Sequence, residues 1–173
     1  MNRSDSSSQE ITTRENQRTR ILGIDYGRAR IGLAIADELT ALAQPLETLE
    51  RINRNEDMRR LRELARTHGV KQIVVGLPLR LDGTHGEMAE ETSRFAERVR
   101  KQLGIPVEMI DERLTSWEAE RLLEEQAGRL LHTASRSGQG KRRQARPRAS
   151  VDAMAAAVIL KEYLEREAAK QSA

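Results

Sequence analysis

Residues 21–37, with the sequence ILGIDYGRARIGLAIAD, constrain the fold of this chain more than any other stretch. The run opens with the letters ILGI, and short apolar runs rich in β-branched residues are typical of strands buried on both faces. A second apolar run begins at Ile31, shortly after Gly27. The two runs are therefore expected to pair as an antiparallel hairpin that turns near this glycine.

Asp25 lies inside the first of these two strands. A carboxylate left unpaired in a dry core costs several kcal/mol, so a positive partner, either an arginine or a metal ion, is expected to meet it. The alternative is a capped turn in which Asp25 accepts hydrogen bonds from backbone N–H groups. The residues of the hairpin alone leave both interpretations open.

The composition limits the chemistry open to the chain. Its 173 residues suit one domain with a real core, and only 2% of them are aromatic, so the core is expected to be aliphatic. The absence of cysteine removes disulfides and thiolate catalysis, and three scattered histidines argue against a zinc enzyme. No apolar run reaches the ~20 residues that span a bilayer. The polar N-terminus lacks the apolar centre of a signal peptide, which predicts a cytoplasmic protein without a membrane partner.

Three parts of the chain are predicted to lie outside regular structure. Residues 1–18 are polar and without periodicity, which predicts a disordered tail, and residues 168–173 are predicted to form a short C-terminal tail. A single domain is expected over residues 19–167, with a flexible basic loop over residues 132–149. Positions 136–148 carry six cations and no acid, which suggests a polyanionic partner. The nucleic-acid contacts expected in this loop are Lys141, Arg142, Arg143 and Arg146.

The rest of the chain alternates between strand and helix patterns. A third, edge strand is expected over residues 45–49. Helical spacing of apolar residues follows, between a cap at Asn53 and a stop at Gly69. Later elements are expected as strands over 73–75 and 107–110 and as helices over 87–103, 115–126 and 151–167. This order predicts an α/β domain with a mixed five-stranded sheet flanked by helices, in which parallel strands follow the antiparallel opening hairpin.

Acids stand at the ends of three apolar elements. Asp25 is on the first strand, and Asp152 is in the first turn of the apolar last helix. Asp111 and Glu112 end a later parallel strand that is expected to lie beside the first. In open α/β sheets the carboxyl ends of the strands line the functional crevice. Carboxylates about 4 Å apart repel one another by roughly 4 kcal/mol at an effective dielectric constant near 20. Oxygen ligands favour Mg²⁺ or Mn²⁺ as the compensating ion.

Such a cluster of acids suggests phosphodiester chemistry, because two ions about 3.5–4 Å apart can activate a water and stabilise the leaving oxygen. Each acid also has a structural alternative. Asp152 can complement the helix dipole, and Glu112 can pair with Arg113 or another neighbour. The joint pattern, rather than any one acid, favours the catalytic interpretation.

Four blocks of the sequence resemble the signature blocks of the YqgF (RuvX-like) family: GIDYGRARIGLAIAD, VVGLPLRLDGTHGE, DERLTSWEAERLL and VDAMAAAVIL. They follow the family's order and spacing from about position 20 to position 164. The family is bacterial, has a ribonuclease H-like fold, and is described both as Holliday-junction resolvases and as pre-16S rRNA nucleases.

The resemblance implies a metal-dependent endonuclease that uses Mg²⁺ or Mn²⁺. Asp25, Glu112 and Asp152 map to its catalytic, metal-binding acids, and Asp111 ranks second. It implies 5′-end processing of pre-16S rRNA in ribosome biogenesis, ahead of Holliday-junction resolution in DNA recombination and repair. The implied partners are precursor rRNA or branched DNA and ribosomal precursor particles, for a monomer or weak homodimer. Nucleic-acid contacts outside the basic loop are expected from Arg28, Arg30, Arg113 and Thr115.

Two other classes of function compete with a nuclease. An actin-like or sugar-kinase-like phosphotransferase shares the Asp-x-Gly strand pair, but it needs two such domains, and this chain has no second Asp-x-Gly. A non-catalytic nucleic-acid-binding or ribosome-maturation factor would keep the fold and present only a basic surface. The presence of all three acids disfavours that alternative.

Overall fold

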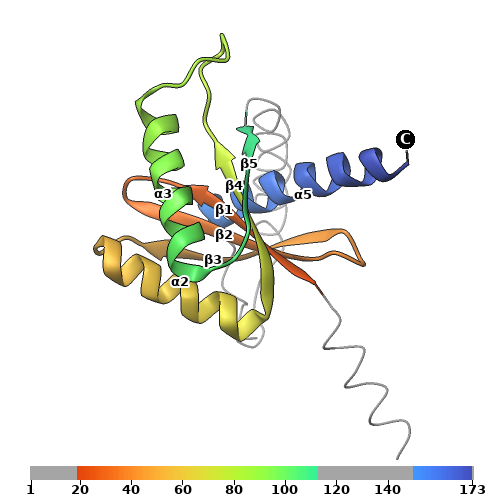
Figure 1. Ribbon diagram of the computed structural model, residues 1–173, viewed down its shortest axis with the longest axis horizontal. Helices are drawn as coiled ribbons and strands as arrows, with labels where there is room; N and C mark the ends of the chain where they lie inside the picture. The colour runs from red at the N-terminus through yellow and green to blue at the C-terminus, as the bar shows by residue number, and fades with distance from the viewer. Residues whose placement is uncertain (1–18, 113–149, 173) are drawn as a thin grey trace, which may run out of the picture.

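The computed structural model describes residues 19–112 and 150–172 (Figure 1). Its elements are β1 Arg20–Tyr26, β2 Arg30–Asp37, β3 Leu42–Glu50, α2 Arg54–His68, β4 Val70–Leu77, α3 Glu87–Leu103, β5 Val107–Asp111 and α5 Val151–Gln171. The described elements follow the order expected from the sequence. The expected tail over residues 1–18, the helix over 115–126 and the basic loop over 132–149 lie outside the described residues.

Five strands form one mixed sheet in the order β3-β2-β1-β4-β5. The strands of the opening hairpin and β3 pair antiparallel, whereas β4 runs parallel to both β1 and β5. The hairpin turns where expected, with the N–H of Gly27 donating to the carbonyl oxygen of Arg30 at 2.9 Å. The predicted mixed sheet and its edge strand β3 are confirmed. The expectation that the strand ending in Asp111 lies beside β1 was wrong, because β4 lies between them.

Helices α2 and α3 cover one face of the sheet (Figure 1). Side chains alternate along β1, so that Leu22 and Ile24 point to this face. There they join a buried cluster that includes Met58 of α2 and Phe95 of α3. Most of the cluster is Leu, Ile, Val and Ala, in agreement with the aliphatic core expected from the composition.

Helix α2 begins and ends, and helix α5 begins, at residues that the sequence marks as caps. The Asn53 side chain accepts hydrogen bonds from the backbone N–H groups of Asn55 and Glu56 at 3.1 and 3.0 Å. Gly69 ends α2 with φ at 64°, in the left-handed region that favours glycine. Ser150 caps α5 through its side chain in the same way. These local signals fix where α2 and α5 start.

Helix α5 covers the opposite face of the sheet, where Ala156 and Leu160 are buried against Ile21 and other residues of the strands. The helix continues to Gln171, so the expectation that residues 168–171 form a tail was wrong. The segment EREAAKQ that ends it consists of good helix formers, which explains the extension. No helix in residues 19–112 or 150–172 is long and apolar enough to cross a bilayer.

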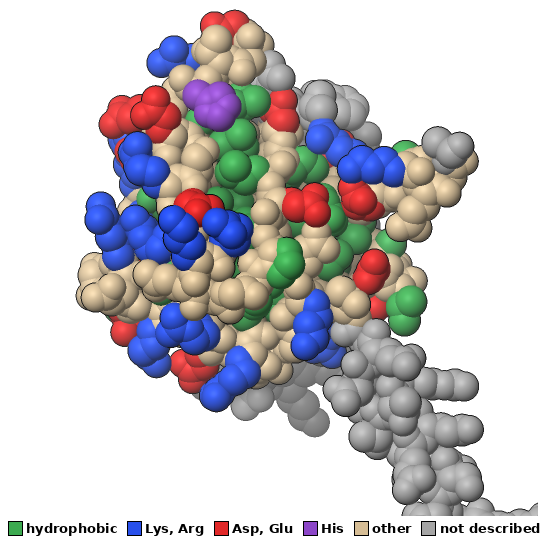
Figure 2. Space-filling view, in the orientation of Figure 1, with side chains coloured by type: hydrophobic (Ala, Val, Ile, Leu, Met, Phe, Trp, Pro, Cys, Tyr) green, Lys and Arg blue, Asp and Glu red, His purple; other side chains and the backbone are tan. Residues whose placement is uncertain are grey.

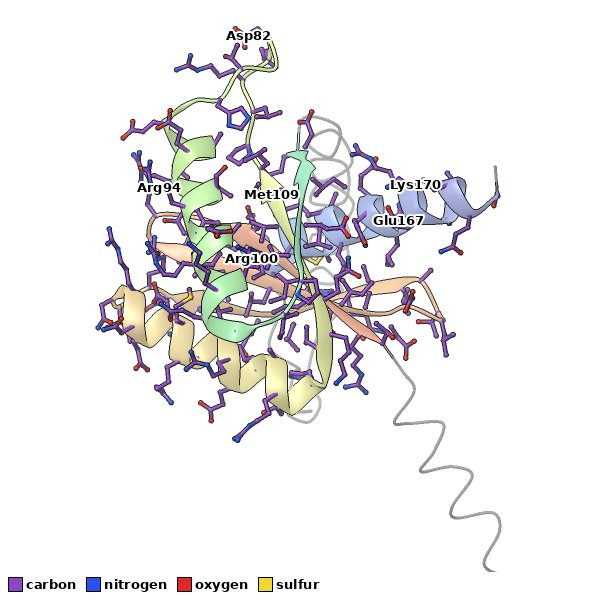
Figure 3. The ribbon with its side chains drawn as sticks, viewed as in Figure 1. Asp82, Arg94, Arg100, Met109, Glu167 and Lys170 are labelled. Atoms are coloured by element: carbon purple, nitrogen blue, oxygen red, sulfur yellow. The ribbon has the colours of Figure 1, made fainter. Side chains whose placement is uncertain are left out.

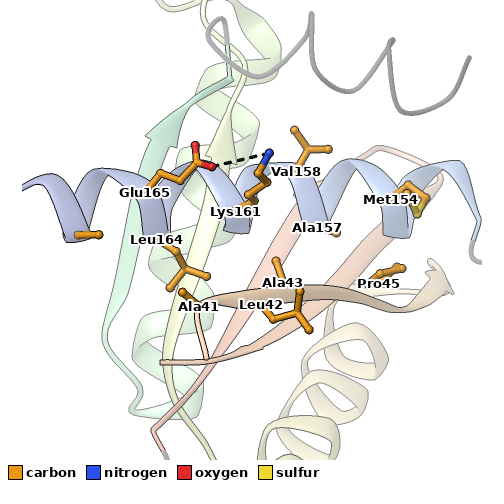
Figure 4. Close-up of a pocket in the computed structure, with 11 residues that line it drawn as sticks. Ala41, Leu42, Ala43, Pro45, Met154, Ala157, Val158, Lys161, Leu164 and Glu165 are labelled. Atoms are coloured by element: carbon orange, nitrogen blue, oxygen red, sulfur yellow. Dashed lines mark ion pairs between the residues drawn. The ribbon is translucent and has the colours of Figure 1, made fainter. Parts of the chain in front are cut away.

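An apolar groove of about 410 Å³ lies between α5 and the edge strand β3 (Figure 4). Ala43 and Pro45 of β3 face Met154 of α5 across it. Lys161 and Glu165, an ion pair at 3.7 Å, lie on the helix side. Helix α5 therefore leaves part of its contact with the edge strand open.

Candidate active site

Asp25, Glu112 and Asp152 lie at one end of the sheet, on the α5 side. Asp25 is near the carboxyl end of β1, Glu112 directly follows β5, and Asp152 is in the first turn of α5. Because β1 and β5 both run parallel to β4, their carboxyl ends meet at the same edge. The structure therefore brings the three predicted acids to the same end of the sheet.

Gly32 lets the start of α5 approach the sheet beside Asp25. It is the residue that pairs with Asp25 across the β1–β2 ladder. A Cβ atom at Gly32 would lie only 1.9 Å from the backbone oxygen of Asp152. A side chain at this position is therefore incompatible with the observed approach of the helix.

Gly76 makes room for Glu112 above the strand that separates β1 from β5. A Cβ atom at this position of β4 would lie 2.1 Å from Oε1 of Glu112 and 2.6 Å from Cδ1 of Ile159. The Glu112 carboxyl group thus lies over β4, on the α5 side of the sheet. Because Gly76 has no side chain, Glu112 can extend over β4 toward Asp25 although β4 separates their two strands.

Burial and neighbouring negative charges raise the pKa values of Asp25 and Glu112. Burial raises the pKa of Asp25 to about 6, and the negative charge of Asp152 adds to this shift. Burial likewise raises the pKa of Glu112 to about 7, with further contributions from the charges of Asp25 and Asp111. Burying carboxyl groups beside other acids does not stabilise a fold, so the cluster is typical of a site for a positively charged ligand.

The structure shows neither an arginine partner nor the capped turn for Asp25 in the described chain, and the metal ion expected as the other possible partner stays a prediction. Within residues 19–112 and 150–172, Asp25 accepts no hydrogen bond from a backbone N–H group and forms no ion pair with an arginine. Its negative charge instead faces that of Asp152. The bonding expected of a capped turn is therefore absent from this part of the molecule.

Arg30 and Arg28, both predicted to contact nucleic acid, bind acids on the two helical layers. Arg30 donates from Nε to Oδ2 of Asp152 at 2.8 Å. Arg28 lies 2.7 Å from Glu91 and 3.0 Å from Glu87, both on α3. The two arginines thereby tie the hairpin to α5 and α3. Their contact with nucleic acid stays a prediction.

The donor set fits a hard divalent cation. No three His, Asp or Glu side chains in the described residues stand close enough together to form a metal-binding group as they are. Asp25, Glu112 and Asp152 nevertheless offer only carboxylate oxygens, and a cation would stabilise the charged forms of Asp25 and Glu112, which burial and neighbouring acids disfavour. These three residues are the ones that would hold the cation, and Asp111 at the end of β5 is a second-rank candidate ligand.

Six of the predicted contacts lie outside the described residues: Arg113, Thr115, Lys141, Arg142, Arg143 and Arg146. Sequence reasoning also missed two residues that shape the site. It gave no role to Gly32, and it treated Gly76 as part of a loop. The available signal was a glycine inside an apolar strand, which often marks the close approach of another segment.

A family model described as RuvX, Holliday junction resolvase, matches residues 19–166. The chain belongs to the RuvX family. The sequence is 45% identical over 149 residues to a protein of Anaeromyxobacter sp. (strain K), covering 86% of this chain and 98% of that relative. It is 46% identical over 146 residues to a protein of Syntrophus aciditrophicus, covering 84% of this chain and 88% of the relative. Both relatives carry the curated name "Putative pre-16S rRNA nuclease".

Among solved structures, the RuvX chain resembles RuvC of T. thermophilus, whose structure was solved in complex with a Holliday junction substrate. The TM-score is 0.53 at 16% sequence identity, covering 87% of this chain and 96% of RuvC. At this identity the likeness is one of fold. It confirms the ribonuclease H-like fold that the four sequence blocks imply.

Proposed function

We propose that this RuvX family member is a nuclease that uses Mg²⁺ or Mn²⁺ to hydrolyse phosphodiester bonds in structured RNA. The reaction we assign to it is 5′-end processing of pre-16S rRNA in ribosome biogenesis. The observation that carries the proposal is the meeting of Asp25, Glu112 and Asp152, from three separate elements, at one end of the sheet. The names of the curated relatives support RNA as the substrate.

The residues of the site have distinct positioning roles in this proposal. When bound, a divalent cation supplies charge neutralisation at the scissile phosphate and activation of the attacking water. Asp25 lies on β1, the middle strand of the sheet, so its position is fixed by the strands on both sides. Glu112 reaches over β4 through the space at Gly76. Asp152 is oriented by the first turn of α5 and by its hydrogen bond from Arg30.

Resolution of Holliday junctions is the second candidate function. The description of the family model and the fold shared with RuvC favour it. The same three acids would serve both reactions, because each is hydrolysis of a phosphodiester bond. The two functions therefore differ in the substrate surface, not in the catalytic group.

The deciding experiment incubates the pure protein with a precursor rRNA fragment and, separately, with a four-way DNA junction. Each is tested with Mg²⁺, with Mn²⁺ and with a chelator. We expect cation-dependent cleavage of the RNA at one position and slower cleavage of the junction. Faster junction cleavage would select the second function. Binding of both substrates without cleavage of either would identify a non-catalytic maturation factor.

The partner that fits this function is a ribosomal precursor particle in the cytoplasm, engaged by a monomer or weak homodimer. Sedimentation of a cell lysate should place part of the protein with particles that contain unprocessed small-subunit RNA. Release from these particles after RNA trimming is the expected behaviour. Absence from every ribosomal fraction would contradict this partner.

A further inference from the structure

The other side of the same strand end carries a cluster of arginines. Tyr26 follows Asp25 on β1, so its side chain points to the opposite face, toward α2 and α3. There it lines a pocket of about 340 Å³ together with Phe95. The other lining residues are charged: Arg51, Arg54, Glu91, Arg94 and Arg98. Lys and Arg side chains gather on the side of the molecule where α2 and α3 lie (Figure 2).

Two of these charged residues are engaged within the protein. Arg51 donates from Nε to the buried Asp57 at 3.0 Å and from Nη1 to the hydroxyl of Tyr26 at 2.9 Å. Its guanidinium carbon lies 4.9 Å from the centroid of the Tyr26 ring. Glu91 accepts a hydrogen bond from Arg28 at 2.7 Å. The one acid of the pocket is therefore already neutralised, and Arg51 is fixed in the wall.

Three arginines remain to act on a ligand. In the part of the chain that the structure describes, Arg54 and Arg98 form no hydrogen bond or ion pair. Arg94 pairs with Glu90 at 3.7 Å and also interacts with the charge of Glu91. Figure 3 labels Arg94 on α3. Like charges around one pocket repel one another, so stability does not explain the cluster. Guanidinium groups match phosphate oxygens in charge and in bidentate geometry.

We infer that this arginine pocket, formed by Arg51, Arg54, Arg94 and Arg98, binds a backbone phosphate of the nucleic-acid substrate away from the bond that is cut. The inference rests on the proposed nuclease function and states where the substrate continues beyond the acids. Because consecutive strand residues point to opposite faces, the acids and the pocket lie on opposite sides of the end of β1. A substrate that reaches both must pass round this end or present two strands. Folded RNA and branched DNA meet that requirement better than a short single strand.

The test compares two double variants of the full chain. Arg54→Gln, Arg98→Gln removes two charges from the pocket, one from α2 and one from α3. The matched control, Arg66→Gln, Arg100→Gln, removes one charge from each of the same helices outside the pocket. Binding of a hairpin RNA is measured in chelator over a series of salt concentrations. Thermal unfolding curves show that each variant is folded.

We expect the pocket variant to reduce the slope of log K against log salt by about 1 for each phosphate that the protein no longer neutralises. Binding should weaken for all RNA sequences alike, and more for the hairpin than for a short single strand. The control should change the slope much less. Equal slopes for the two variants would overturn the inference, because the arginines would then act only through net charge.

Two further measurements distinguish a pocket for RNA phosphate from a site for free phosphate, and distinguish failure of this inference from failure of the proposed nuclease function. Titration with inorganic phosphate tests for a free anion, and tight phosphate binding without any change in the RNA slope would overturn the assignment to a polymer. Cleavage by the wild type in Mn²⁺ is measured in parallel. A wild type that binds but does not cleave refutes the nuclease and leaves the pocket result valid, since binding is measured in chelator. A wild type that binds no nucleic acid refutes both.

Discussion

The two sides of the end of β1 are built for different purposes. Toward α2 and α3, Leu22 and Ile24 are buried among apolar side chains. Toward α5, the same strand presents Asp25 to a second carboxylate, that of Asp152, and burial raises the pKa of Asp25. The buried Leu22 and Ile24 lower the free energy of the fold, whereas the charge of Asp25 carries an electrostatic cost. The alternation of side chains along one strand thus lets core residues and a candidate catalytic acid lie back to back, although Ile21 is also buried beneath α5 and the arginine pocket lies on the α2/α3 side.

The largest expected effect is the loss of cleavage when the acids of the α5 side are replaced. Asp25→Asn and Glu112→Gln each keep the side-chain shape and remove one negative charge. We expect cleavage of structured RNA in Mn²⁺ to fall by roughly 10²–10³-fold, the scale on which loss of one group that stabilises developing charge is felt. Binding in chelator should be retained or improve, because a charge that repels phosphates is gone.

Glu38→Gln is the control for this experiment, because it removes an exposed acid at the other end of β2 and should leave the rate unchanged. A double variant, Asp25→Asn with Asp152→Asn, that still cleaves at the wild-type rate would show the acids to be structural. The division of the strand into a stable side and a chemical side would then be wrong.

The α2/α3 side should respond in the opposite way. Leu61 is fully buried there, and Leu61→Ala should reduce the free energy of unfolding by about 2–5 kcal/mol because it leaves a cavity. The cleavage rate below the melting transition should stay within a few-fold of the wild type. Thermal melts and single-turnover cleavage measure the two quantities. Leu39→Ala, at a side chain that is 79% exposed, should change neither. A large loss of rate in Leu61→Ala without loss of stability would contradict the comparison.

The two glycines of the α5 side should separate stability from activity on a finer scale. Gly32→Ala collides with the backbone of Asp152, which cannot move without shifting α5, so it should cost about 1–3 kcal/mol of stability. Gly76→Ala collides with the ends of the Glu112 and Ile159 side chains, which can rotate away. It should cost less stability and more activity, because Glu112 is the displaced group. Equal stability losses with unchanged cleavage would contradict the role given to Gly76.

Local signals predicted most of the fold because each is read from neighbouring residues. The cap at Asn53, the stop at Gly69 and the apolar runs of the strands all mark elements that the structure contains. The position of β5 was mispredicted, since periodicity does not state how a crossover connection orders parallel strands. The helix end was also misplaced, at residue 167 instead of Gln171, where no glycine or proline marks the stop.

The site was predictable only in part, for the same reason. Its acids stand at element ends, a pattern visible in the sequence, and the structure brings Asp25, Glu112 and Asp152 to one edge. The space that Gly76 gives to Glu112 is a relation between two strands, and a glycine inside an apolar strand signals a close approach without identifying the residue that approaches. The arginine pocket joins separate segments of the chain, and each of its arginines alone is typical of an ordinary solvated surface.

The smallest expected effect is a pH dependence of the free energy of unfolding, caused by Asp25 and Glu112 on the α5 side. The folded-state pKa values of Asp25 and Glu112, about 6 and about 7, lie above their ordinary values near 4. Between pH 4 and pH 7 the folded state thus binds more protons than the unfolded state. The stabilisation is fully present below pH 4 and is lost as the pH rises through 6 and 7. In chelator, the slope of this loss should be at most about 1.4 kcal/mol per pH unit for each acid.

The double variant Asp25→Asn, Glu112→Gln isolates this contribution, because every other titrating group is shared with the wild type. The difference in unfolding free energy between variant and wild type should grow in the variant's favour from pH 4 to pH 7. Millimolar Mn²⁺ should reverse the trend for the wild type only, since an ion that binds the native state raises its stability by RT ln(1 + [L]/Kd). A difference that is independent of pH would show that the two carboxyl groups titrate alike in the folded and unfolded chains. The electrostatic cost assigned to the α5 side would then not exist.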